Sequence, residues 1–406
     1  MEDDASAAEF GDNPFANLPM FGDLAKALAG QGPLNWDAAR QFAAMAATSR
    51  DDKNDGNTVG TTAAITDGNV DPTVRIALGD LARIVELHVR DLTGLDTIFP
   101  EVTPVTPTVW AQRALEAYRP LFTELATSLG RRQSPSADDQ EPDPLMAMMS
   151  NLSQMMAPSM MGMAVGSMVG RLAVRTFGQY DLPIPRRDRA LMLVPANIDQ
   201  FATDWSLPVD EMRLWTLAQE MIGHTLFGFE PLCEQLSALV RRHVGAFHPD
   251  ANAVAEHLAS LETDNADPMA AMQQLLSDPA LLLGAVQSPE QVALAPQLDA
   301  AIAAVVGSVD YLVDAVAARV IGGDALRIAE AVRRRRFEAT PDDLFVERLL
   351  GLHLSQEQVQ RGKVFTAGVV DRVGETGLVQ FFAGGQPLPT PAELDAPGLW
   401  IARLEL

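Results

Sequence analysis

Apolar residues recur every three to four positions along most of the chain, a spacing typical of helices packed on a core. Residues 71–94 open with an aspartate and a proline and end at a glycine, the usual signals for the start and stop of a helix. Similar patterns predict helices over residues 107–129 and 208–227. Short stretches at 191–194 and 377–382 suggest strands. The sequence therefore predicts a mainly α-helical fold with minor, short β segments.

Polar stretches between these patterns predict the domain organisation. Residues 1–12 are acidic and small, and we expect them to be disordered. Residues 13–49 form an N-terminal helical segment, and residues 50–70 a polar linker with almost no large apolar side chain. The main domain then covers residues 71–406, with a flexible loop rich in proline and aspartate at 130–144.

A methionine-rich stretch at residues 146–170 stands apart, because it holds nine of the 17 methionines. Gly162, Gly166 and Gly170 recur at four-residue spacing, which predicts one smooth helix face for close packing. Pro158 interrupts the apolar run and arginines follow it, so we expect a buried helix or a contact surface for a partner protein rather than a membrane span.

Charge and cysteine content limit the classes of function. The net charge of −24 argues against binding to nucleic acid or to an anionic membrane surface. The run Arg333–Arg336 is the exception, and we expect it to be the solvated last turn of a helix. Cys233 is the only cysteine, which excludes internal disulfides and predicts a core residue. The start of the sequence shows no secretory signal, so we expect a cytoplasmic protein.

Candidate chemistry lies in the helix predicted over residues 208–227. Leu214–Phe227 reads LWTLAQEMIGHTLF, close to the zinc-protease pattern His-Glu-x-x-His. In that pattern two histidines one turn apart bind zinc, and the glutamate activates a water molecule. Here Gln219 and Gly223 stand at the two histidine positions, while Glu220 keeps the glutamate. Neither a neutral amide nor a glycine supplies a good zinc ligand.

His224 leaves two interpretations open. It lies four residues after Glu220 on the same helix face, where the two side chains can form an ordinary pair that contributes about 0.3–0.5 kcal/mol to helix stability. Alternatively, Glu220 and His224 are ligands of a re-registered metal site, together with an acidic residue such as Asp310 or Asp314. The other histidines are expected on the surface or as satisfied core residues.

Three segments outside this helix carry a resemblance to a known family. Gly32–Arg40 (GPLNWDAAR), Phe177–Pro185 (FGQYDLPIP) and Trp205–Trp215 (WSLPVDEMRLW) are similar to segments of the actinobacterial zincin-like metallopeptidases. That family is often described as putative hydrolases or as deazaflavin-coenzyme-biosynthesis-associated proteins. The resemblance covers most of the chain and implies a zincin-like helical domain with a zinc site.

The resemblance also indicates where this chain departs from the family. The family's third ligand is a glutamate before a glycine on a later helix, and Val306 occupies that position here, while Gly307 and Asp310 are kept. With Gln219, Gly223 and Val306 at the ligand positions, a degenerate HExxH site with no metal is expected, and Glu220 becomes a vestigial general base. The sequence thus predicts a cytoplasmic pseudoenzyme that binds a peptide or protein segment. An active metal-dependent hydrolase using Glu220 and His224 is the alternative.

Overall fold

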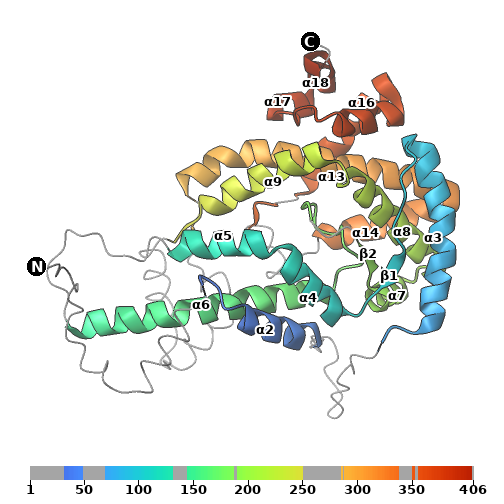
Figure 1. Ribbon diagram of the computed structural model, residues 1–406. Helices are drawn as coiled ribbons and strands as arrows, with labels where there is room; N and C mark the ends of the chain where they lie inside the picture. Colours follow the sequence, from blue (N-terminus) through green and yellow to red (C-terminus); the bar gives the residue numbers. More distant parts are fainter. Residues whose placement is uncertain are drawn as a thin grey trace, which may run out of the picture.

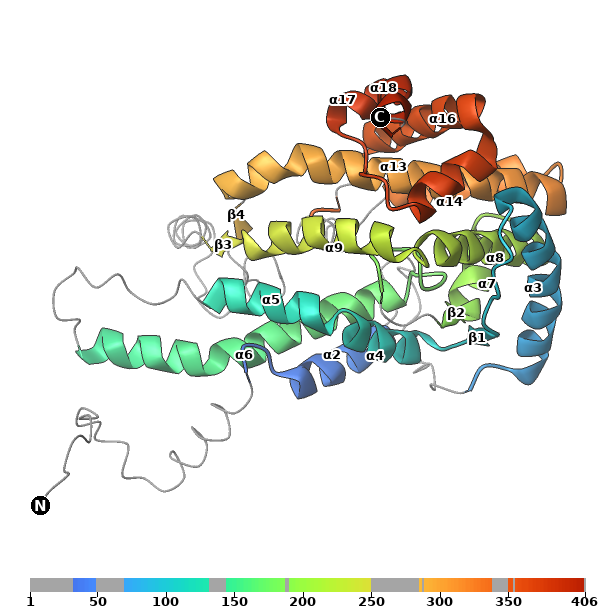
Figure 2. The same ribbon diagram turned by 45° about the horizontal axis from the view of Figure 1, so that its top comes forward.

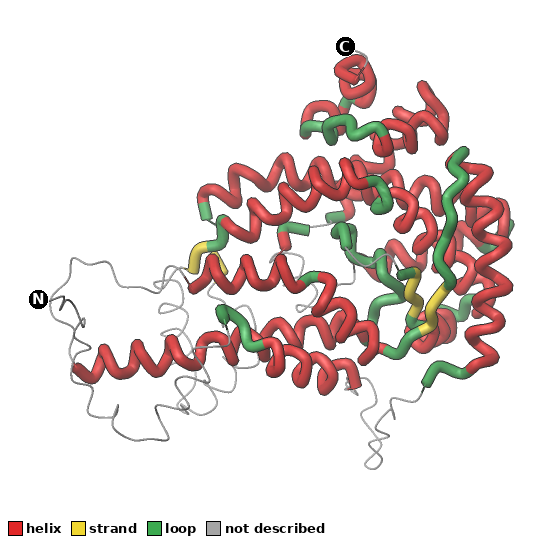
Figure 3. The backbone as a smooth tube through the Cα atoms, in the orientation of Figure 1, coloured by secondary structure: helices red, strands yellow, loops and turns green. Residues whose placement is uncertain are grey.

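The computed structural model describes residues 32–48, 69–130, 144–186, 190–249, 285–286, 288–337, 350–352 and 355–404. These residues are mainly α-helical, as predicted, with a few short strands (Figure 3). The helices are α2 (Trp36–Thr48), α3 (Pro72–Thr93), α4 (Pro107–Ala117), α5 (Arg119–Gly130), α6 (Pro144–Ala173), α7 (Pro195–Asp204), α8 (Val209–Leu226), α9 (Glu230–Gly245), α13 (Pro289–Val320), α14 (Ala325–Phe337), α16 (Gln356–Ala383), α17 (Pro391–Asp395) and α18 (Pro397–Leu404). The strands are β1 (Val102–Pro104), β2 (Leu191–Leu193), β3 (His248–Pro249) and β4 (Ala285–Val286).

The long helix α13 forms the centre of the fold. It contacts α3, α8, α9, α14, α16 and α17, and it runs beside α9 with the C-terminal helices on its outer side (Figures 1 and 2). Within the described part of the chain, α13 is the one helix long and apolar enough to cross a membrane. However, 78% of its apolar stretch is buried inside the protein, which is the position of a core helix.

The glycine repeat of α6 packs against α2, which confirms the smooth face predicted from its spacing. A Cβ added at Gly166 or Gly170 would lie 2.3 or 2.5 Å from a main-chain carbonyl oxygen of α2, and one at Gly162 would lie 2.3 Å from the carbonyl oxygen of Asn35, directly before α2. Such distances are too short for any side chain, so the two backbones approach as closely as glycine allows. The N-terminal helix α2 is thereby packed into the same core as α6.

Local sequence signals set several helix ends. Asp71 caps α3, and Gly94 ends it in the left-handed conformation with φ of 67°. The helix predicted over 107–129 is instead two helices, α4 and α5, which meet at Tyr118. Pro120 accounts for this break, because a proline removes one main-chain donor and cannot continue a preceding helix.

The strand predicted at 377–382 is wrong, because these residues belong to α16. Leu378, Val379 and Phe382 are buried on one helix face, a spacing that helix and strand share over so short a run. The predicted tail at 1–12 and most of the linker and of the loop at 130–144 lie outside the described residues.

The strand predicted at 191–194 is confirmed as β2, which pairs in parallel with β1. Gly178 forms an isolated bridge to Leu193, and Val194 N donates to the Phe177 carbonyl at 2.8 Å. The segment that follows α6, residues 174–186, is thus attached to β2. This attachment places it beside α8, where the candidate chemistry lies.

Candidate functional site

Helix α8 carries the motif into the interior. It starts after Pro208, with Asp210 and Glu211 in its first turn, where acidic side chains interact favourably with the helix dipole. Every residue from Trp215 to Leu226 is buried. The motif positions therefore face protein on all sides, and their partners come from neighbouring elements rather than from solvent.

Glu220 is fully buried and is held by the loop after α6. Its Oε2 accepts from Gln179 N at 2.7 Å, and its two oxygens accept from Tyr180 N at 3.1 and 3.2 Å. A Cβ at Gly178 would lie 2.3 Å from Glu220 Cδ, so only glycine leaves room for the carboxyl group there. Burial raises the pKa of Glu220 well above its ordinary range, and the nearby Asp181 raises it further.

Two side chains fix the loop that holds Glu220. Trp110 Nε1 and Thr176 Oγ1 both donate to the Gly178 carbonyl, each at 2.8 Å. With its carbonyl turned toward these donors, the loop presents the next two main-chain N–H groups to the carboxyl group. The segment FGQYD, which the sequence marked only by resemblance, is therefore the direct support of Glu220.

Tyr180 occupies the space beside Gly223. A Cβ at Gly223 would lie 2.7 Å from Tyr180 Cβ and 2.8 Å from Tyr180 Cγ. The tyrosine ring stacks on the Phe227 ring, with the two ring centroids 5.8 Å apart. The Tyr180 hydroxyl lies 3.1 Å from His224 Nδ1. Glu220 and His224 thus share a helix face, as predicted, but each bonds to a different part of the same tyrosine.

Gln219 points toward Asp181, an acidic residue that sequence reasoning did not select. Gln219 Nε2 donates to Asp181 Oδ1 at 2.9 Å. Asp181 Oδ2 accepts from Phe177 N at 2.6 Å and lies 3.4 Å from Arg335 Nη2. In the sequence, the only feature that pointed to Asp181 was its position in the FGQYD segment. The amide at the first histidine position is therefore fixed in a chain of polar contacts that ends at an arginine.

The structure brings Gln219, Gly223 and Val306 together, although Val306 lies on α13 and not on α8. All three line one cavity of about 100 Å³, whose wall also includes Tyr180 and Arg336. A zinc site needs at least three protein donors. These positions offer a neutral amide, no side chain and an alkyl group. The residues present therefore do not fit the zinc ion that the resemblance implies.

The prediction that Arg333–Arg336 form a solvated turn holds for the exposed Arg334 but is wrong for Arg333, Arg335 and Arg336, which are half-buried. Arg335 Cζ lies 3.7 Å from the Phe177 ring centroid, and its Nη2 donates to the Arg175 carbonyl at 2.9 Å. Burial lowers its pKa to about 10. In the last turn of α14, Arg336 pairs with the buried Asp310 at 2.8 Å, and Arg333 pairs with the half-buried Asp314. Carboxylates of α13 thus compensate the charges of Arg333 and Arg336.

These ion pairs bear on the alternative metal site. Asp310 and Asp314 are both engaged by α14 arginines, and Lys363 Nζ also lies 3.7 Å from Asp314. Over the residues that the structure describes, no group of three or more His, Cys, Asp or Glu side chains is arranged to hold a metal ion. The lone Cys233 packs against the core, and its Sγ lies 3.0 Å from the Phe227 carbonyl.

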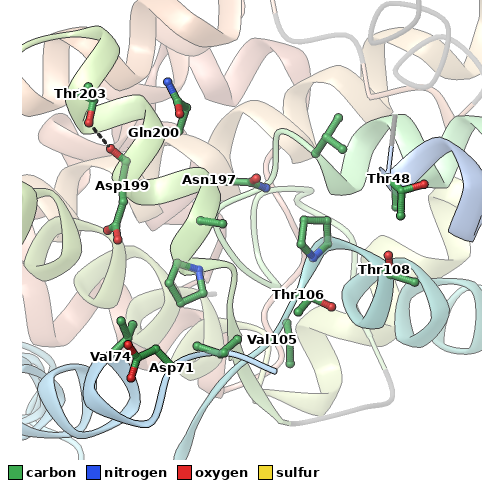
Figure 4. Close-up of a pocket in the computed structure, with 16 residues that line it drawn as sticks. Thr48, Asp71, Val74, Val105, Thr106, Thr108, Asn197, Asp199, Gln200 and Thr203 are labelled. Atoms are coloured by element: carbon green, nitrogen blue, oxygen red, sulfur yellow. Dashed lines mark hydrogen bonds between the residues drawn. The ribbon is translucent and has the colours of Figure 1, made fainter. Parts of the chain in front are cut away.

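A larger cavity of about 540 Å³ lies away from the motif, between α2, α3, α4 and α7 (Figure 4). Most of the polar groups in its wall have partners within the chain. Asp71 and Thr106 cap helices, Asn197 donates to two carbonyl oxygens, and Asp199 pairs with Arg213 at 2.7 Å. None of the motif residues reaches it, so this cavity carries no chemistry predicted from the sequence.

Comparison with known proteins agrees with this architecture. A crystal structure of a putative hydrolase with a novel fold from Chloroflexus aurantiacus is similar, with a TM-score of 0.57 and 20% sequence identity over 92% of this chain and 99% of that chain. At this identity the likeness shows the fold alone. No curated protein matches the chain. The family model for zincin-like metallopeptidases matches residues 34–401. The chain therefore belongs to the zincin-like metallopeptidase family.

Proposed function

We propose that this chain is a cytoplasmic pseudoenzyme of the zincin-like metallopeptidase family, which has lost its zinc ligands and acts by binding. The observation that carries the proposal is the meeting of Gln219, Gly223 and Val306 in one cavity. These are the three positions at which the resemblance expects zinc ligands. Changes at three unconnected surface positions would carry no such meaning.

The neighbours of these positions support the same conclusion. Tyr180 fills the space into which a side chain at residue 223 would extend. Asp181 holds the Gln219 amide at 2.9 Å, so this amide already has a structural role. Glu220 takes its hydrogen bonds from main-chain N–H groups, and it has no access to solvent. A general base needs to reach the water from which it takes a proton.

The dimensions of the cavity suggest what it binds. Pockets for whole small molecules usually measure about 300–1,000 Å³, while this cavity measures about 100 Å³. It is large enough for one side chain of a peptide or protein segment. Its wall is mostly apolar, with Leu182, Val309 and Leu352 beside the polar Gln219 and Arg336. The methionine-rich stretch at 146–170 is a second candidate contact surface.

Elemental analysis of the purified protein tests the loss of zinc. We expect far less than one zinc per chain, because the three positions offer no adequate donor set. Zinc close to one equivalent per chain that survives gel filtration would contradict the proposal.

Peptide binding tests the cavity itself. We expect a fluorescent peptide library to contain sequences that bind the wild type and lose affinity for Val306→Trp, because the indole fills the cavity. Val292→Trp is the matched control on the same helix, since Val292 is 56% exposed and lies outside the cavity wall. Equal binding to both variants would count against a ligand in this cavity.

The alternative function is a metal-dependent hydrolase that uses Glu220 and His224 with Asp310 or Asp314. The observation in its favour is that Glu220 and His224 both lie beside Tyr180. This alternative expects cleavage of a peptide or ester that chelators inhibit and that Glu220→Gln abolishes. Cleavage at an unchanged rate in that variant would remove it.

A further inference from the structure

A buried arginine with no acidic partner among the described residues lies at the far end of the loop that holds Glu220. Arg186 is 8% exposed, and its three guanidinium nitrogens are covered and have no hydrogen-bond partner in the described part of the chain. Its Cζ lies 5.1 Å from the centroid of the Tyr118 ring. The Tyr118 hydroxyl is also buried, and its one polar neighbour in the described part of the chain is Arg186, which lowers the pKa of Tyr118 against the effect of burial. The three guanidinium nitrogens and the hydroxyl therefore have at most each other as partners, and the neutral hydroxyl does not compensate the guanidinium charge.

Such an arrangement is costly without a bound group. A buried charge is stable only when an opposite charge or several hydrogen bonds compensate for its lost hydration. Stacking on an aromatic ring offsets a small part of this cost. Guanidinium groups in protein interiors therefore normally meet a carboxylate or a phosphate.

Glu220 does not supply the missing partner. It lies within electrostatic range of Arg186, but no ion pair within 4.0 Å joins the two side chains, and the Glu220 oxygens are bonded to main-chain N–H groups. Because burial raises the pKa of Glu220, its charge is also weakened as a counter-ion. Arg186 is therefore left with a positive charge that the described residues do not neutralise.

Arg186 and Tyr118 are both part of the wall of a cavity of about 110 Å³ between α5, α9 and the end of the loop. Arg241 and Ser237 of α9 contribute to the same wall, and Arg241 is exposed. Two arginines at one small cavity make a local positive region in a chain whose net charge is −24. The remaining wall is apolar: Pro120, Leu121, Ile184, Pro185 and Val240.

We propose that this cavity binds a carboxylate group, held by the Arg186 guanidinium and the Tyr118 hydroxyl, with its alkyl part against the apolar wall. One buried cation matches the single charge of a carboxylate better than the higher charge of phosphate. The planar guanidinium matches the two carboxylate oxygens. The occupant is a short-chain carboxylic acid or the C-terminal carboxylate of a peptide. The site uses none of the motif residues, so it stands independently of the proposed function.

Acetate is the probe that tests this site. At constant ionic strength, replacing chloride by acetate is expected to raise the melting temperature of the full-length protein in a saturable way, because the ligand binds only the folded state. Arg186→Met should abolish this rise. Tyr118→Phe should weaken acetate binding about threefold to tenfold, the usual range for one hydrogen bond. Arg83→Met is the control, since Arg83 pairs with Asp80 on the surface of α3.

Four outcomes would contradict parts of this proposal. An acetate response that survives in Arg186→Met, or a wild type that responds equally to acetate and chloride, overturns the proposal. A stronger response to inorganic phosphate than to acetate overturns the carboxylate assignment. Tyr118→Phe keeps the test valid if the arginine variant does not fold. In chloride alone this variant should be at least as stable as the wild type, and a clear loss would show that the hydroxyl is already satisfied.

Discussion

The Tyr180 side chain lies against the backbone of Gly223, so that a Cβ added at residue 223 would be 2.7 Å from Tyr180 Cβ. An aromatic ring from the loop after α6 thus fills the space at the second histidine position of the motif. The glycine and the tyrosine fit each other. Changing the one without the other is expected to disturb the packing of α8.

This fit changes how a zinc site could be restored. The variant Gln219→His, Gly223→His, Val306→Glu supplies three donors, but its second histidine collides with Tyr180. We expect it to bind little zinc, and we expect the same variant with added Tyr180→Ala to bind close to one zinc per chain. Elemental analysis after dialysis distinguishes them. Full zinc loading of the variant that keeps Tyr180 would show that the ring moves aside easily.

The raised pKa of Glu220 predicts a pH-dependent stability difference. The folded protein keeps a proton on Glu220 that the unfolded chain releases near the ordinary pKa of about 4.3. The stability from this group is therefore complete below that value and is lost as the pH rises through the raised pKa. Glutamine does not titrate, so the stability of Glu220→Gln relative to the wild type should increase as the pH rises above the ordinary value toward the raised pKa of Glu220. Urea unfolding measures this, and a constant difference across the range would contradict it.

Gly178 is expected to tolerate no side chain. Alanine at this position would place its Cβ 2.3 Å from Glu220 Cδ and push the carboxyl group off its two main-chain donors. We expect Gly178→Ala to lower the free energy of unfolding by about 1–3 kcal/mol. Gly79→Ala is the control, because nothing lies within 4 Å of its added Cβ; this change should be neutral or stabilising. Equal effects of the two substitutions would contradict the close contact.

Substitutions of Asp181 and Arg335 are expected to have strongly coupled effects on the free energy of unfolding. Asp181→Asn removes the acid beside a buried guanidinium, while Arg335→Met removes the guanidinium itself. Because an unpaired buried charge is more costly than its absence, the double variant should be more stable than Asp181→Asn alone. Chemical denaturation of all four proteins gives the coupling energy. Additive effects would show that the two side chains act independently.

The packing of α2 on α6 is also open to test. Alanine at Gly166 would place a Cβ 2.3 Å from the Ala39 carbonyl oxygen, which forces the two helices apart. We expect a loss of about 1–3 kcal/mol and faster trypsin cleavage after Arg40, which lies on α2. Gly79→Ala again serves as the control. If cleavage at Arg40 does not change, the two helices adapt to the added methyl group without separating.

Local sequence signals determined much of the fold. The cap at Asp71 and the stop at Gly94 appear where the sequence places them, because capping depends on residues within one turn. The glycine repeat of α6 predicted a close helix contact, although not its partner α2. Short apolar runs were ambiguous, and for this reason residues 377–382 were predicted as a strand but lie in α16.

The sequence by itself placed Gln219 and Gly223 one turn apart on a helix, and the resemblance added Val306 from a distant segment. Only the tertiary structure decided that these three residues share one cavity and that Tyr180 fills the space beside Gly223. It also decided that Arg336 and Arg333 of α14 pair with Asp310 and Asp314 instead of being solvated. The spacing of residues along a helix determines only which side chains are neighbours within about two turns of that helix. Contacts between α8, α13, α14 and the loop after α6 depend on how these elements pack together, and no local pattern in the chain records that packing.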